Sequence, residues 1–222
     1  MKLPNFVSAP ALLLLAGSCL AQAPVPPQLQ FLEGHAGAVR DVAFTADNKL
    51  LLSVGLDGTL RVWDRTTGLL VRTINASSRQ NLCLALTPDG LQAILGSVDG
   101  SLKFFDIPRP SAVYEFAGIP AAPTAIAPSA DGKFVVTGDA ATYVRLFDAT
   151  TKAHVRDYPG TVGGVTGVAA FPEQKLILAT GVDGALRGWN FDTAAATGVI
   201  QFPSAAAMDV HAQGKLVAVV GA

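Results

Sequence analysis

One spacing limits the fold of this 222-residue chain more than any other feature. Four pairs of an aromatic residue followed by Asp or Asn stand at successive intervals of 42 positions. The four pairs are Trp63-Asp64, Phe105-Asp106, Phe147-Asp148 and Trp189-Asn190. An interval that is kept three times over indicates an internal structural repeat. We therefore expect similar units of 42 residues that stack on one another.

Other residue types keep the same interval. A basic residue stands two positions before each aromatic, and an Asp stands six positions before three of them. These residues are Arg61, Lys103, Arg145 and Arg187, then Asp57, Asp99 and Asp183. The basic residues suggest either an anion-binding ring or, as we favour, stems that pack beside the aromatics with their charged heads in water.

The first unit predicts four short strands without a helix. Apolar residues alternate in 39–44, and a mostly apolar run follows at 49–53. Asp57-Gly58 is a tight hairpin sequence that leads into 60–63, and a last strand follows at 69–72. Four such strands form an antiparallel blade, and one blade cannot bury both apolar faces alone.

The residues of this unit resemble the WD-repeat family of β-propellers. The resemblance lies in Gly34-His35, in 42–45 and in 53–64, and it extends from Gln28 to Ala222. It implies an all-β propeller of four-stranded antiparallel blades, with four full repeats and a partial fifth. In that family a His, a Ser or Thr, an Asp and a Trp form a hydrogen-bonded network, and the matching residues here are His35, Ser53, Asp57 and Trp63.

Later units depart from this pattern. The His position holds Ser77, Ile119 and Thr161, the Ser position holds Leu95, Thr137 and Ala179, and Ala141 replaces the third Asp. We expect the complete network in the first blade alone. The repeat signature is carried by Asp64, Asp99, Phe105, Asp106, Phe147, Asp148, Asp183 and Trp189.

The family resemblance also implies where partners bind. It places partner contacts on the loops before the first strand and between the second and third strands of each blade. The candidate residues are Ala38, Leu56, Gln80, Val98, Ala122, Ala140, Gly164 and Val182. Because they are mostly small or aliphatic, they predict a shallow apolar surface without large anchors.

The first residues have the order of a secretory signal peptide. Lys2 precedes an apolar run at 11–15 and small residues at 16–19. We expect a signal peptide at 1–21, a Pro-rich linker at 22–29 and repeats at 30–222. Alternatively, residues 15–19 resemble a lipobox, in which Cys19 is lipidated and the protein is an envelope lipoprotein acting as an assembly subunit. Either way the protein would be exported, to the periplasm, the exterior or a lipid anchor, without a transmembrane span.

The repeat region holds between four and five units, so a closed ring of whole blades is not expected. Residues 30–32 occupy the place of an outermost strand, and a fifth unit would begin near Ala207. We therefore expect an open or truncated ring, as in an N-terminal fragment of a longer propeller.

Reactive chemistry has no recognisable motif here. His35, His154 and His211 lie at different positions of different units, so we expect no metal or cofactor. With 16 Lys and Arg against 17 Asp and Glu, nucleic acid is an improbable partner. Ser53 with His35 and Asp57 has the composition of a catalytic triad, but we favour the structural network.

Together these features favour a noncatalytic protein-interaction scaffold rather than an enzyme. A remaining alternative is a docking or sensor module of an enzyme that continues beyond residue 222.

Overall fold

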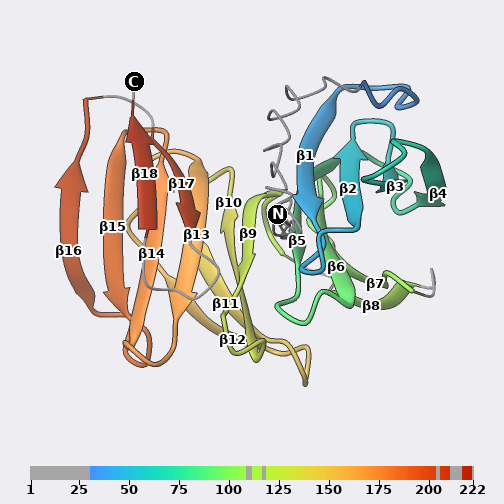
Figure 1. The fold of residues 1–222 in the computed structure, drawn as a ribbon. Coiled ribbons are helices and arrows are strands. Elements are labelled where there is room, and N and C mark those ends of the chain that lie inside the picture. Colours follow the sequence, from blue (N-terminus) through green and yellow to red (C-terminus); the bar gives the residue numbers. More distant parts are fainter. Residues whose placement is uncertain (1–30, 109–111, 117–118, 204–205, 211–216, 222) are drawn as a thin grey trace, which may run out of the picture. The chain divides into compact units, whose positions relative to one another are not determined.

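The computed structural model describes residues 31–108, 112–116, 119–203, 206–210 and 217–221. The predicted signal peptide, the linker at 22–29 and Cys19 lie outside these residues. Phe31–Ala222 forms one compact unit. Every regular element described in it is a strand (Figure 1).

Four antiparallel sheets of four strands follow one another along the chain. Each sheet is a blade whose strands pair in chain order, which confirms the predicted fold class. Blade 1 holds β1 (Val39–Phe44), β2 (Leu50–Gly55), β3 (Thr59–Asp64) and β4 (Leu70–Asn75). Blade 2 holds β5 (Asn81–Leu86), β6 (Gln92–Ser97), β7 (Leu102–Asp106) and β8 (Ala112–Phe116). Blade 3 holds β9 (Pro123–Pro128), β10 (Phe134–Asp139), β11 (Val144–Asp148) and β12 (His154–Tyr158). Blade 4 holds β13 (Val165–Phe171), β14 (Leu176–Gly181), β15 (Ala185–Asn190) and β16 (Ala196–Gln201).

The 42-residue interval reappears in the irregularities of the sheets. One residue is skipped in the pairing of each first strand, and one in each fourth strand. These residues are Arg40, Leu82, Thr124 and Thr166, then Val71, Val113, Val155 and Thr197. Because a bulge bends a strand and increases its twist, the same bulge in each blade gives the blades a common curvature.

The Asp that follows each aromatic shapes the turn after the third strand. Asp64 Oδ1 accepts hydrogen bonds from the amides two and three residues ahead, at 2.9 and 2.8 Å. Asp148 and Asn190 do the same in blades 3 and 4. Asp106 instead accepts from the side-chain amide of Gln92 at 2.9 Å. A short acceptor at this place therefore builds the turn.

Apolar side chains bury the faces between consecutive blades. One cluster joins blades 1 and 2 around Leu52, Leu60, Leu95 and Phe105. The other two clusters join blades 2 and 3, and blades 3 and 4. A lone blade would leave these faces in water, so the blades stabilise one another.

Hydrogen bonds also connect each innermost strand to the next blade. Asp41 accepts from the Leu84 amide at 2.9 Å, and the Cys83 thiol donates to the carbonyl of Pro123 at 3.4 Å. Thr124 donates to the carbonyl of Val165 at 2.7 Å. Three different side chains, one acceptor and two donors, thus link blades 1 to 4 in succession.

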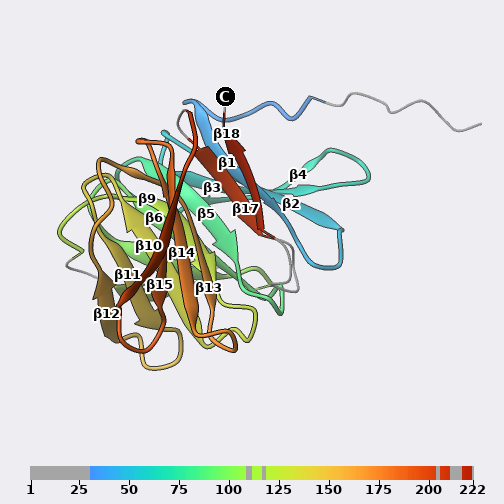
Figure 2. The same cartoon turned by 90° about the vertical axis from the view of Figure 1, so that its left-hand side faces the viewer.

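A fifth unit is represented by a hairpin of β17 (Ala206–Val210) and β18 (Val217–Gly221), visible in Figures 1 and 2. Strand β17 contacts β13 and β14 of blade 4. The expected outermost strand at 30–32 is not formed at Phe31 and Leu32, and Gln30 lies outside the described residues. Phe31 is 83% exposed, because no described strand lies alongside to pair with this segment.

Candidate functional site

Blade 1 contains a continuous chain of four hydrogen-bonded side chains. His35 Nδ1 lies 2.9 Å from Asp57 Oδ2, and His35 Nε2 lies 2.8 Å from Ser53 Oγ. The indole N–H of Trp63 donates to the same Ser53 oxygen at 2.8 Å. The loop before β1 is thereby fixed to β2, to β3 and to the hairpin between them.

Asp57 is the most strongly bonded member of this network. Its carboxylate also accepts from the Ala36 amide at 2.9 Å and from the Thr59 amide and hydroxyl at 3.0 and 2.8 Å. Burial raises the pKa of Asp57, but the hydrogen bonds from Thr59, His35 and Ala36 outweigh this effect. The net pKa lies well below its usual range, so the carboxylate stays charged.

The order Asp57, His35, Ser53 is that of a catalytic triad, but the surroundings do not suit catalysis. Only 5% of Ser53 is exposed, and the side chains of His35 and Asp57 are 5% and 9% exposed. The Ser53 oxygen already accepts from Trp63. A nucleophile must reach its substrate, whereas this hydroxyl joins two strands.

Blades 3 and 4 lack the histidine, and an arginine binds the carboxylate instead. Arg187 donates to both oxygens of Asp183 at 3.1 and 2.5 Å. Arg145 donates to Asp139 at 2.5 Å. Asp139 stands two residues before Ala141 and was missed in the sequence because it breaks the register of the repeat. It also accepts from the amides of 141–143, so it replaces the missing hairpin Asp.

The expectation that the basic heads reach water is wrong for two blades. Arg145 is 7% exposed and Arg187 has a side-chain exposure of 12%, because both guanidinium groups turn inward to a carboxylate. In blade 2 burial raises the pKa of Asp99, but hydrogen bonds from Ser101 and Ser97 and the charge of Lys103 outweigh this effect and lower it. In blade 1 the Asp57 carboxylate is hydrogen-bonded to His35. The buried Nε of Arg61 has no hydrogen-bond partner among the described residues.

The eight predicted partner-face residues meet in pairs, one pair in each blade. In every pair the amide after the second strand donates to the carbonyl before the first strand. The donors and acceptors are Leu56 to Ala38 at 3.0 Å, Val98 to Gln80 at 3.0 Å, Ala140 to Ala122 at 3.1 Å and Val182 to Gly164 at 2.9 Å. We call these four bridged pairs the loop face.

Exposed side chains cluster at the loop face. Val98 and Val182 are 40% and 53% exposed, and neighbouring Val162 is 62% exposed. Tyr143, in the hairpin between β10 and β11, is 41% exposed and stacks under the Arg145 guanidinium at 5.0 Å. The repeat pattern does not single out this tyrosine, because small residues hold the equivalent position in the other blades. Tyr143 therefore adds one aromatic side chain beside the small and aliphatic residues of the predicted surface.

The described residues show neither a metal-binding group of His, Cys, Asp and Glu nor a helix of the length and apolarity that a membrane span requires. His211 lies outside the described residues. Cys83 is buried, and burial raises the pKa of its thiol far above the usual range.

Comparison with known proteins agrees with this architecture. The model of the WD domain, G-beta repeat, matches residues 26–64, which contain the network residues and end at Trp63-Asp64. Residues 26–64 therefore form a WD repeat, and the chain is similar to WD-repeat proteins over part of its length.

Several curated WD-repeat proteins are similar over part of their length. Ribosome biogenesis protein YTM1 of Laccaria bicolor is 38% identical over 80 residues, which are 36% of this chain and 18% of the relative. WD repeat-containing protein sll1491 of Synechocystis is 36% identical over 72 residues, which are 32% of this chain and 21% of the relative. The WD repeat-containing protein AAC3 of Dictyostelium discoideum is 29% identical over 90 residues, which are 39% of this chain and 19% of the relative. The chain thus spans about a fifth of the length of these relatives.

Proposed function

We propose that this WD-repeat protein is a noncatalytic scaffold that binds protein segments on its loop face. The four equivalent backbone bridges carry this proposal. They hold eight loop positions in a fixed arrangement while side chains such as Val98 and Val182 stay exposed. Rigid loops with exposed apolar groups are suited to recognition, because little freedom is lost on binding.

Two further observations support a scaffold. The one triad-like group is buried within a strand network, and proteins of this family generally act without chemistry of their own. Tyr143 and the valines offer an aromatic anchor with an aliphatic surround, a combination that dominates many interfaces.

A peptide selection tests this function. The full chain is immobilised and used to enrich a random peptide library displayed on phage, and the enriched peptides are synthesised. We expect binding that falls at least tenfold in a variant with Val98→Glu and Val182→Glu. The control is Val155→Glu, on the outer strand β12, where an exposed valine is replaced away from the loop face. Failure to enrich any peptide, or equal binding to both variants, would contradict the proposal.

We also propose that the protein is exported. Lys2, the apolar run at 11–15 and the small residues after it support a signal peptide. N-terminal analysis of the mature protein separates the two forms of export. A free terminus at Gln22 indicates ordinary cleavage, a lipid on Cys19 indicates an envelope lipoprotein, and an intact Met1 refutes export.

A further inference from the structure

Two arginines near the loop face, one in blade 1 and one in the loop that leads into blade 2, differ from the corresponding residues of other blades. Arg40 is the bulged residue of β1, and Arg79 lies in the loop before β5. Both are exposed, and neither side chain forms an ion pair or hydrogen bond among the described residues. The equivalent positions hold Leu82, Thr124 and Thr166, then Gly37, Ala121 and Gly163. The two charges are therefore confined to the boundary between blades 1 and 2.

Both arginines flank the same hairpin. The amide of Leu56 donates to the carbonyl of Ala38, two residues before Arg40. On the other side, the carbonyl of Arg79 approaches Gly58 so closely that an added Cβ there would lie 2.8 Å from it. The backbone two residues before Arg40 and the backbone of Arg79 thus both lie beside the hairpin of blade 1. We call this hairpin with its two arginines the basic corner.

The carboxylates near the basic corner, including Asp41, accept hydrogen bonds from other groups and form no ion pair with Arg40 or Arg79 among the described residues. Asp57 accepts from His35, Thr59 and Ala36, and Asp99 accepts from the amide and hydroxyl of Ser101. In blades 3 and 4, by contrast, the arginine beside each hairpin is paired with an Asp of its own blade. Arg40 and Arg79 therefore present two exposed guanidinium groups that form no ion pair within the described part of the chain.

Apolar groups adjoin this charge. Leu56 is half-buried in the hairpin, and Val98 in the next blade is 40% exposed. We propose that the basic corner binds an acidic segment of a partner protein, with Asp or Glu side chains on Arg40 and Arg79 and a neighbouring aliphatic side chain on Leu56 and Val98. Guanidinium groups suit this task because they form paired, charge-assisted bonds with carboxylates.

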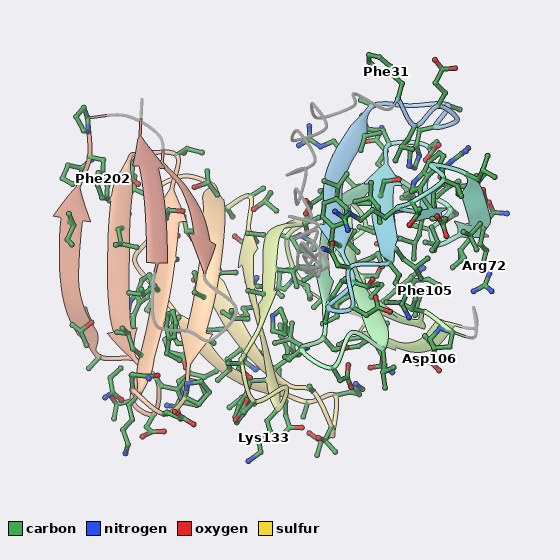
Figure 3. All side chains as sticks on the ribbon, in the orientation of Figure 1. Phe31, Arg72, Phe105, Asp106, Lys133 and Phe202 are labelled. Atoms are coloured by element: carbon green, nitrogen blue, oxygen red, sulfur yellow. The ribbon has the colours of Figure 1, made fainter. Side chains whose placement is uncertain are left out.

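This inference rests on the proposed function and adds the chemistry of the partner. The peptides enriched on the full chain are expected to carry Asp or Glu beside Val, Leu or Ile. Binding is expected to fall at least tenfold with Arg40→Ser and Arg79→Ser, and to weaken as salt is added. The control is Lys49→Ser with Lys133→Ser, which removes two charges from turns between first and second strands. Lys133 lies at the end of the blades opposite Phe31 and Phe202 (Figure 3).

The outcomes separate the two proposals. Loss of binding with the valine variant but not with the arginine variant would retain the scaffold and overturn the acidic partner. Enriched peptides without acidic residues would do the same. Loss of peptide binding in the arginine variant, with binding retained in the lysine control, supports the basic corner as the site for an acidic segment. Peptide binding that is unchanged in both the valine variant and the arginine variant would overturn both proposals.

Discussion

Arg61 is expected to take over the partner of His35 when that histidine is removed. In blade 4 the arginine four residues after the hairpin Asp holds that Asp with two bonds, and Arg61 stands in the same relation to Asp57. In the native blade His35 is hydrogen-bonded to the Asp57 carboxylate, and Arg61 has no ion pair among the described residues. The two residues therefore compete for one carboxylate.

The expected free energies follow from the bonds. His35→Ala breaks contacts to Asp57 and Ser53 and should cost about 2–4 kcal/mol if nothing replaces them. A new Arg61 to Asp57 ion pair should recover about 1–2 kcal/mol. Arg61→Ala alone should cost no more than about 1 kcal/mol. The double variant should therefore lose about 1–2 kcal/mol more than the sum of the single losses.

Urea unfolding measures this coupling. The chain has two tryptophans, so Trp189→Phe leaves Trp63 as the fluorescent reporter of blade 1. The matched control pairs His35→Ala with Arg65→Ala, an exposed arginine in the turn after β3, and should be additive. Additive losses for His35 and Arg61 would refute the competition for Asp57.

Three other predictions concern pH, a buried hydroxyl and a thiol. Because the pKa values of Asp57 and Asp183 are lowered in the folded state, their carboxylates stabilise the fold above the unfolded pKa of about 4. This stabilisation declines progressively as pH falls below that value and is gone below the folded pKa values. Urea unfolding at pH 7 and pH 3 should show the loss, and equal stability would contradict it. Tyr158→Phe removes the 2.6 Å hydrogen bond to the Phe191 carbonyl and should cost about 1–2 kcal/mol in thermal unfolding, whereas no change would argue against that bond. Cys83 should resist iodoacetamide in peptide mapping until urea unfolds the chain, and rapid native labelling would disprove its burial.

Much of the fold could be predicted because each unit contains its own turn chemistry. Asp57-Gly58 identified the hairpin, and Gly58 there adopts a φ of 76° that suits glycine. The alternation at 39–44 gave the bounds of β1 correctly. Such signals are local, so they survive in a single sequence.

The parts that sequence did not predict depend on contacts between distant residues. Asp139 replaces the missing hairpin Asp from two positions upstream, which a fixed interval cannot show. Arg145 turns inward because that carboxylate is there, although the surrounding pattern suggests a solvated head. Arg40 and Arg79 become neighbours of one hairpin through pairings across the blade, and Tyr143 is exposed through the shape of its loop.

Amide hydrogen exchange on the full chain tests the loop face most directly. The proposed scaffold requires that four loop amides be held by the same bridge, namely those of Leu56, Val98, Ala140 and Val182. We predict slow exchange at all four, although the neighbouring side chains are exposed. Fast exchange at these amides, at a rate near that of unstructured chain, would contradict a rigid binding face.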